Sequence, residues 1–343
     1  MTTEMKPGRR LETQVHRQSL IDWGRRQPET VLLSGDLTVA CEADGFQQAY
    51  PDRFISMGLM EQNMMGFAAG LAREGFIPLV HTFAVFMYRR ALDQVEMSIA
   101  NAYLPVRMFG FLPGVTTPGG PSHQATNDVA VLRSLPNMTV VEVGDATDIE
   151  GLYELSLQVD GPMYVRMLRG ELPRLFPADS RLELNRARTL STGDDIALLT
   201  TGVCTEEALR VTGLLSDAGI GVTHLHVTTL KPFSDPQVTD AIERSRYGAV
   251  TMENHTSIGG LGSCVADLIA EHGLAKRLVK VSTGDRYLQG ASAPYLAEHY
   301  GIDAPALVDA VERLVGRPLG ISHEQLASAN VSDFVGENQL EAL

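Results

Sequence analysis

Short apolar runs alternate with helical patterns along most of this chain, and this alternation constrains the fold more than any other feature. In the first half, almost continuously apolar runs occupy residues 30–34, 54–57, 76–81, 106–111, 138–143 and 162–168. Helical patterns lie between or beside them, at residues 11–24, 61–72, 88–101 and 145–159. Strands that are apolar throughout are typical of a parallel sheet covered on both faces by helices. We therefore expect a doubly wound α/β domain.

A second α/β series follows an irregular, charged stretch at residues 168–194, which we interpret as a linker. Strands are predicted at residues 196–201, 222–228 and 247–252, with helices at residues 205–218 and from the GGLGS segment to near residue 273. The sequence thus predicts two consecutive doubly wound α/β domains with mostly parallel sheets, at residues 8–178 and 190–318. The polar segment at residues 319–343 is either a loosely held tail or an arm that grips a partner.

The composition excludes several classes of partner. The 343 residues carry a net charge of -14, whereas nucleic acids and anionic membranes attract basic surfaces. The N-terminus lacks the apolar core of a signal peptide, and no run of about 18 uncharged apolar residues is present to span a bilayer. We expect a soluble, cytoplasmic protein. Cys41, Cys204 and Cys264 lack C-x-x-C spacing, which favours buried reduced thiols over disulfides or zinc ligands.

The segment at residues 54–72 places one carboxylate beyond the end of a buried strand. Glu61 is the only ionised residue between Arg53 and Arg73, in the first turn of an otherwise apolar helix. Ligands bind at the carboxyl ends of parallel strands, and apolar surroundings raise the pKa of a carboxyl group. The alternative is that Glu61 only stabilises the helix N-terminus. The small residues of this helix are expected to form one face open to close backbone contact: Gly66, Ala68, Ala69 and Gly70.

A long loop, LPGVTTPGGPSHQ, follows the strand at residues 106–111. Loops of this length are usually functional or disordered. This loop leads into a helix start at Thr126-Asn127-Asp128 and then a clear strand, so both of its ends are fixed. We therefore interpret the loop as functional.

Three segments in this order carry a specific resemblance: GLMEQNMMGFAAGLA from Gly58, HTFAVFMYRRALDQV from His81 and GGPSHQATNDVAVLRSLPNMTVV from Gly119. In their residues and spacing, these segments resemble the pyrimidine-binding half of the transketolase family of thiamine-diphosphate enzymes. The later segments TGVCTEEAL, TLKP, TMENH and GGLGS resemble the family's C-terminal domain. The resemblance covers nearly the whole chain, apart from the first few residues and the tail.

The family's diphosphate-binding half has no counterpart here. That half holds the cofactor diphosphate and Mg²⁺ through a Gly-Asp-Gly segment and a later asparagine, and the nearest words, such as Ser34-Gly35-Asp36, lack this continuation. The resemblance therefore implies the C-terminal subunit of a split transketolase, with no metal site of its own. The binding site for thiamine diphosphate and Mg²⁺ would be completed by an N-terminal, diphosphate-binding partner subunit. The expected assembly is an α2β2 heterotetramer, with a dimer of this chain as the form without the partner.

The resemblance assigns roles on the cofactor side to four residues. Glu61 matches the glutamate that hydrogen-bonds the aminopyrimidine ring and drives the imino tautomer that deprotonates the thiazolium C2. Phe83 and Phe86 match the aromatic pair that packs on the pyrimidine. An isolated F-x-x-F would favour core packing, but Glu61 upstream and the ALDQV segment downstream favour the cofactor role. Arg90 stands where related sequences carry arginine, with a solvated helix surface as the alternative.

On the substrate side the resemblance assigns two residues. His123 matches the histidine that faces C2 and handles substrate hydroxyl protons, a task suited to a side chain that titrates near neutral pH. Arg169 matches the arginine that grips the sugar phosphate, because a planar guanidinium binds an anion through two hydrogen bonds. A simple surface charge remains the alternative for Arg169.

The departures from the family pattern concern the substrate. Phe111 stands where sugar-phosphate enzymes have a histidine, and Gly119 where they have an aspartate that reads sugar hydroxyls. Gln14 stands in place of a second phosphate-binding arginine, with His16 and Arg17 close by. We expect a substrate that is less polar, or that carries a different anion, than the pentose phosphates of central metabolism.

The expected activity is transfer of a two-carbon ketol unit from a ketose to an aldehyde, which makes the chain one subunit of a transferase. Within the superfamily, deoxyxylulose-phosphate synthase or a 2-oxo acid decarboxylating subunit is an alternative. A catalytically silent scaffolding subunit is the alternative of another class. Retention of Glu61, Phe83, Phe86 and His123 weighs against a silent subunit, because folding alone requires none of them.

Overall fold

The first sheet contains the six strands expected from the apolar runs of the first half, although the edge strand, at residues 54–56, is partly exposed and not buried as predicted. In the computed structural model, which describes residues 11–329, β2 (Thr30–Ser34), β3 (Phe54–Ser56), β4 (Ile77–Phe83), β5 (Arg107–Phe111), β6 (Thr139–Glu142) and β7 (Met163–Met167) pair in parallel. Their order across the sheet is β3-β2-β4-β5-β7-β6. The chain passes from β2 to β3 on one side and then returns across β2 to β4 on the other side. Such a reversal of direction is typical of doubly wound sheets.

Helices cover this sheet, and those at residues 61–73, 128–134 and 146–156 begin close to their predicted starts, whereas the helix at residues 44–49 was not predicted. They are α1 (Val15–Arg26), α2 (Asp44–Ala49), α3 (Glu61–Arg73), α4 (Ala84–Arg89), α5 (Asp128–Ser134) and α6 (Ala146–Ser156). Asp145 caps α6 as expected, because its carboxylate accepts from the backbone N–H of Asp148 at 2.7 Å. α1 begins later than predicted, since β1 (Leu11–Thr13) pairs with β8 (Glu171–Pro173).

The prediction of one helix over residues 88–101 was wrong. α4 starts at Ala84, the chain turns at Arg90 and Ala91, and a π-helical segment, η2, occupies Gln94–Ala100. The run from Ala84 to Tyr88 is buried all round, so its sequence looks like a continuation of β4. The turn makes Arg90 the C-terminal cap of α4.

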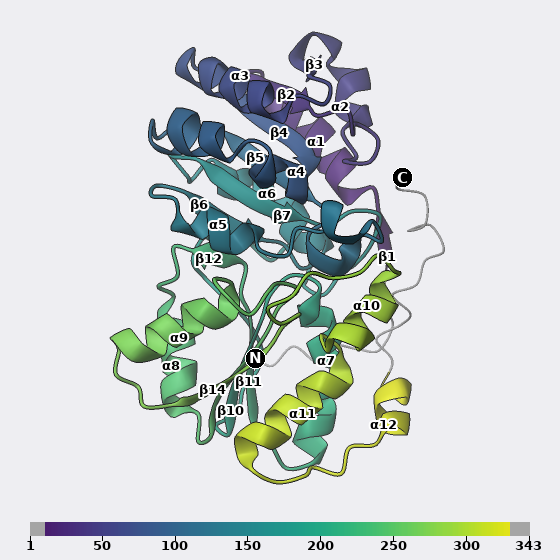
Figure 1. Cartoon of the computed structure of the whole chain (residues 1–343), viewed down its shortest axis with the longest axis vertical. Helices are drawn as coiled ribbons and strands as arrows, with labels where there is room; N and C mark the ends of the chain where they lie inside the picture. Colours follow the sequence, from purple (N-terminus) through teal and green to yellow (C-terminus); the bar gives the residue numbers. More distant parts are fainter. Residues whose placement is uncertain (1–10, 330–343) are drawn as a thin grey trace.

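The second sheet has the order β14-β13-β10-β11-β9. Its strands β10 (Ile196–Thr200), β11 (Val222–His226), β13 (Gly248–Met252) and β14 (Arg277–Val281) are parallel, and β9 (Arg188–Ser191) adds an antiparallel edge. Figure 1 shows α8 (Pro236–Arg244) and α9 (Leu261–Glu271) on one side of this sheet and α7 (Cys204–Asp217) and α11 (Ala304–Val315) on the other. Alternate residues of β10 therefore enter different cores, Ala197 and Leu199 on one face and Ile196 and Leu198 on the other.

The two halves are more closely joined than the sequence indicated. β12 (Thr229–Lys231), which follows β11 in the second half, pairs antiparallel with β6 and becomes the edge strand of the first sheet. The predicted linker also contains two strands, β8 and β9. Apolar residues of both halves accordingly share one core.

Beyond α10 (Ala293–Tyr300) and α11, the described part of the predicted tail forms a helix, α12 (His323–Ser328). Its Leu326 is buried in the second core, and the Leu326 carbonyl accepts from Nη2 of Arg210 at 2.9 Å. Residues 330–343, where the rest of the predicted tail falls, lie outside the described residues.

Three further expectations can be compared with the described residues. Cys41, Cys204 and Cys264 are buried free thiols, which confirms their interpretation. Between residues 11 and 329 no cluster of three or more His, Cys, Asp or Glu side chains is arranged to hold a metal ion. Over the same residues, no helix has both the length and the apolar character needed to cross a membrane.

Candidate active site

The predicted site residues come from segments that follow neighbouring parallel strands. Glu61 follows β3, Phe83 ends β4, His123 lies on the long loop after β5, and Arg169 follows β7. The carboxyl ends of parallel strands meet at one edge of a sheet, and that edge is where α/β folds bind ligands. The topology therefore gathers segments that are more than 100 residues apart in the sequence.

Glu61 is the first residue of α3 and is only 3% exposed. It is not an isolated carboxylate: Nη1 of Arg90 donates to its Oε1 at 2.6 Å. The Arg90 side chain is 46% exposed, so a buried carboxylate meets a guanidinium that reaches in from the surface. The turn after α4 places Arg90 at this position.

Two phenylalanine rings continue the arrangement. The rings of Phe83 and Phe86 are nearly parallel, with centroids 5.9 Å apart. The guanidinium carbon of Arg90 lies 3.9 Å from the centroid of the Phe86 ring, in a cation–π contact. Arg90 therefore packs on an aromatic face while it donates to a carboxylate.

His123 lies on the other side of Phe86. The two rings meet edge to face, with centroids 5.4 Å apart. Nδ1 of His123 is 2.9 Å from the hydroxyl of Ser122. A Cβ added at Gly119 would lie 2.7 Å from the Cβ of His123, so His123 occupies the space that an aspartate at position 119 would need. The position of the His123 side chain thus leaves no room for an aspartate at position 119.

The chain also contains a site residue that the sequence analysis missed. Arg89, beside Arg90, donates from Nη1 to the Pro121 carbonyl at 2.6 Å and from Nη2 to the Gln124 carbonyl at 3.2 Å. These carbonyls lie on either side of His123 in the sequence. The Arg89-Arg90 pair was a visible signal, but only the fold shows that the two guanidinium groups face different partners.

Arg169 is placed near a different loop. Its Nη1 donates to the Ala40 carbonyl at 3.1 Å, and the next residue, Gly170, donates its N–H to Oε1 of Glu42 at 2.7 Å. Arg169 is thus held at the loop after β2, and this hydrogen bond does not join it to Glu61 or His123. Its role as an anion ligand stays a prediction.

The residues on which the substrate prediction rests largely contact other residues of the protein. Phe111 is fully buried and its ring packs against His16 and His81, with centroids 5.1 and 5.8 Å apart. Burial lowers the pKa of His81 to about 3 and, with the neighbouring His81, lowers the pKa of His16 well below its usual value. Arg17 pairs with Asp44 at 3.0 Å. Position 111 therefore belongs to the core in this chain and not to an open site.

The prediction that four small residues share one face of α3 was wrong. Ala68 and Ala69 are buried in the core, together with Met64 and Met65, whereas Gly66 and Gly70 are exposed. An added Cβ at either glycine would meet no atom within 4 Å. Small side chains give no amphipathic signal, so the sequence alone did not separate the two sets.

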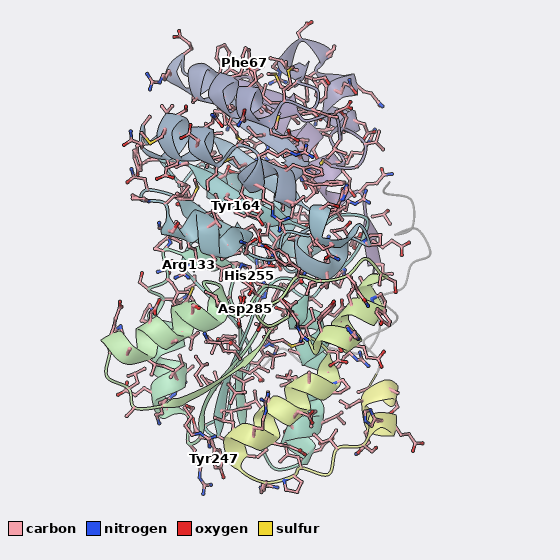
Figure 2. All side chains as sticks on the ribbon, viewed as in Figure 1. Phe67, Arg133, Tyr164, Tyr247, His255 and Asp285 are labelled. Atoms are coloured by element: carbon pink, nitrogen blue, oxygen red, sulfur yellow. The ribbon has the colours of Figure 1, made fainter. Side chains whose placement is uncertain are left out.

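The exposed side of this region includes several large apolar side chains. Figure 2 shows Phe67 of α3 at the far end of the first domain from the second domain. We call the surface-exposed apolar side chains of α3, the turn before it and η2 the α3 patch: Leu59, Met60, Phe67 and Met97. Because α3 and η2 lie against each other, these exposed apolar side chains form a candidate interaction surface.

Comparison with known proteins identifies the family of the chain. Residues 13–174 match the transketolase pyrimidine binding domain and residues 185–307 match the transketolase C-terminal domain. The chain therefore belongs to the transketolase family, whose enzymes are transferases and whose pyrimidine domain implies dependence on thiamine diphosphate.

Several relatives are individual subunits or sections of transketolases. The chain is 38% identical, over 82% of its length and 83% of the relative, to a transketolase family protein of Sinorhizobium fredii. It is 37% identical, over 87% of its length and 92% of the relative, to the 6-deoxy-6-sulfo-D-fructose transketolase subunit SqwH of a Clostridium species. A deoxyxylulose-phosphate synthase of Geobacter sulfurreducens is 30% identical over 91% of this chain, which spans 49% of that protein.

A solved structure shows the same relationship. The β4 tetramer of a split-gene transketolase, described as inactive, superposes with a TM-score of 0.80 at 34% identity. The match covers 88% of this chain and 97% of that one. The chain is thus similar, along most of its length, to one subunit of a divided transketolase.

Proposed function

We propose that this chain is the pyrimidine-side subunit of a two-chain transketolase, which moves a two-carbon ketol unit from a ketose to an aldehyde. The observation that carries the proposal is the continuous row formed by Glu61, Arg90, Phe86 and His123. It combines a buried carboxylate, a flat aromatic surface and a proton-transferring imidazole at the ligand-binding edge of the sheet.

The residues of this chain fit the aminopyrimidine end of thiamine diphosphate. Arg90 is a planar cation that lies over Phe86 and donates an N–H to Glu61, and a protonated aminopyrimidine offers the same two features. When bound, thiamine diphosphate supplies the nucleophilic carbon that carries the two-carbon unit. Phe83 and Phe86 bind the flat ring, and Glu61 holds the proton at the ring nitrogen. The diphosphate and Mg²⁺ are assigned to the partner subunit.

His123 is assigned the transfer of protons to and from the hydroxyl groups of the substrate. The hydroxyl of Ser122 engages Nδ1, which leaves Nε2 as the ring nitrogen for the substrate. Arg169 is assigned an anionic group of the substrate. The similarity to a subunit named for a sulfonated fructose favours a sulfonate or a phosphate as that anion.

The partner subunit is proposed to cover the α3 patch, and the proposed complex is an α2β2 heterotetramer. Light scattering of this chain, alone and with the partner, tests the assembly. Phe67→Glu should reduce association, because it would bury a charge in an apolar interface. Leu157→Glu, at an exposed apolar residue outside the patch, should not. Equal association of both variants would contradict the assignment. A cytoplasmic location also stays a prediction.

The decisive experiment is calorimetry with thiamine diphosphate and Mg²⁺, followed by turnover assays of the complex. We expect little binding to this chain alone and clear binding to the complex. Assays should compare 6-deoxy-6-sulfo-D-fructose and xylulose 5-phosphate as ketose donors, with pyruvate to test the deoxyxylulose-phosphate synthase alternative. Tight binding by the isolated chain would refute the divided site. A complex that binds the cofactor but turns over no donor would favour the scaffolding alternative.

A further inference from the structure

The loop that carries His123 is closed at its base by its own backbone. The N–H of Gly114 donates to the Ala125 carbonyl at 2.8 Å, and Pro113 and Ala125 form an isolated β-bridge. The intervening residues include two short 3₁₀ turns, Gly114–Thr116 and Gly120–Ser122. The position of His123 therefore depends on what holds this base and the turns beyond it.

A single side chain of the second domain grips the base of the loop. Asn254, only 1% exposed, follows β13. Its Oδ1 accepts from the N–H of Val115 at 2.9 Å, and its Nδ2 donates to the Pro113 carbonyl at 3.1 Å. Gly114 between them has φ +59, and an added Cβ there would fall on the Asn254 amide. Both hydrogen-bonding groups of one amide are thus used on the two loop residues that flank Gly114.

The loop is anchored in the second domain by packing as well. Val115 is buried and belongs to the core cluster of the second domain, where Val250, Met252 and Leu288 also lie. Asn254 is itself fixed, because Nη2 of Arg166 donates to its backbone carbonyl at 3.0 Å and also to the Ala125 carbonyl at 3.2 Å. One guanidinium nitrogen therefore ties Asn254 to the far end of the loop base.

The turns near His123 touch the second domain again. Nε2 of Gln124 donates to the carbonyls of Thr117 and Gln289, both at 3.2 Å. A Cβ added at Gly290 would lie 2.9 Å from the Pro118 carbonyl, so the two backbones are in close contact. The loop is held by the second domain at its base and at its rim.

From these contacts we propose that Asn254 is a positioning residue for His123, and that the C-terminal domain takes part in catalysis by fixing this loop. Asn254 touches no reacting atom and acts through the loop backbone. The inference rests on the proposed function only for the role of His123, since the attachment of the loop can be measured without any turnover. Misplacing a catalytic group by about 1 Å can cost on the order of 100-fold in rate.

The first test is amide hydrogen exchange of the full chain. Asn254→Ala should speed exchange of the peptide spanning residues 112–127 by about tenfold or more, with exchange in β10 and α7 unchanged. The matched control is Gln237→Ala, which removes another side-chain amide of the same domain whose Nε2 donates to the Ala187 carbonyl. Asn254→Asp retains the acceptor for Val115 and should have a smaller effect. Unchanged exchange over residues 112–127 would overturn the proposal.

The second test is a double-mutant cycle in the complex, assayed with 6-deoxy-6-sulfo-D-fructose or xylulose 5-phosphate. Asn254→Ala should lower kcat by about 10- to 100-fold with little change in KM. In a His123→Ala background the same change should cost less than about twofold, because its effect runs through His123. Equal losses in both backgrounds would overturn the positioning role. If the parent complex turns over neither donor, the proposed function fails, and hydrogen exchange still decides whether Asn254 fixes the loop.

Discussion

Two guanidinium–carboxylate clusters of this chain have similar bond lengths and opposite surroundings. At the junction of the domains, Arg166 contacts Asp128 at 2.9 Å and Glu142 at 2.6 Å, and the three side chains are 0%, 0% and 3% exposed. At the candidate site, Arg90 contacts Glu61 at 2.6 Å and is nearly half exposed. The difference teaches that enclosure, and not the ion pair itself, separates a structural cluster from one that is available to a ligand.

The enclosed cluster leaves its arginine no freedom. Nε and both terminal nitrogens of Arg166 donate to two carboxylates and two backbone carbonyls, which belong to both domains. Tyr164, beside this cluster, and His255 of the second domain lie near the level where the domains meet in Figure 2. Burial lowers the pKa of Arg166, but the two carboxylates outweigh this and raise it overall. The open pair is joined by one hydrogen bond, and its half-exposed arginine has one aromatic contact. A ligand that offers Glu61 a new donor can therefore replace Arg90 at little cost.

The largest effect should come from breaking the enclosed cluster. Arg166→Met leaves two buried carboxylates without their cation and should lower the free energy of unfolding by about 3–5 kcal/mol. Urea denaturation followed by circular dichroism measures the change. Arg25→Met, at an exposed arginine paired with Asp22, is the control and should change stability by less than about 1 kcal/mol. Similar shifts for the two variants would show that enclosure does not matter.

At the open pair, the large effect should be on activity. Glu61→Gln should lower turnover of the complex by roughly 10²- to 10⁴-fold, because an amide cannot hold the proton shared with the ring nitrogen. The glutamine carbonyl can still accept from Arg90, so the urea midpoint should stay near that of the parent. Glu74→Gln, just past the other end of α3, should leave turnover unchanged. More than about half of the parent rate in Glu61→Gln would disprove the assigned role.

A smaller effect is expected from pH at the junction. Burial, with the nearby charge of Arg166, lowers the pKa of His255 to about 4. Below about pH 6.5, His255 therefore binds a proton in the unfolded chain but not in the folded chain. The free energy of unfolding consequently falls as the pH falls towards 4. His255→Gln should reduce this slope by up to about 1.4 kcal/mol per pH unit. The exposed His272→Gln should leave the slope as it is, and the same slope in both variants would rule out this contribution.

The smallest effect should follow from removing the open arginine. Arg90→Gln should change the free energy of unfolding by about 1 kcal/mol or less, because Arg90 is half exposed and a glutamine amide keeps a hydrogen-bond donor beside the buried Glu61 carboxylate. Thermal unfolding of the isolated chain measures this, with the parent chain at the same concentration as the reference. A loss above about 2 kcal/mol would place Arg90 with the structural cluster and remove the contrast between the two.

The sequence predicted the parts of the molecule that depend on local pattern. Strands β2 and β5 are buried on both faces, so their apolar runs are unambiguous. The family resemblance pointed to Glu61, Phe83, Phe86 and His123. In the fold, Phe86 contacts Phe83 and His123, and Arg90 links it to Glu61. Arg89 and Asn254 could not be found this way, because their loop contacts span about 30 to 140 residues of sequence.

The error on α3 has a physical cause. Ala68 and Ala69 continue the stripe of Glu61, Met64, Met65 and Ala72 at helical spacing, and this stripe faces the core. Gly66 and Gly70, four residues apart, lie on the outer side with Phe67. Burial of an alanine and exposure of a glycine cost too little for composition to distinguish them. A bulky residue at Ala69 would therefore disturb this chain's own core before any contact with a partner.

The exchange of β12 between the halves has a consequence for how the protein can be divided. A gene fragment that stopped at residue 178 would omit β12 and leave β6 as a bare strand edge, which is a template for pairing with other chains. The complementary fragment would carry a strand, β12, that has no sheet to join. We therefore expect the two domains to be expressed and inherited as a pair. Recombination between homologues should keep both domains together.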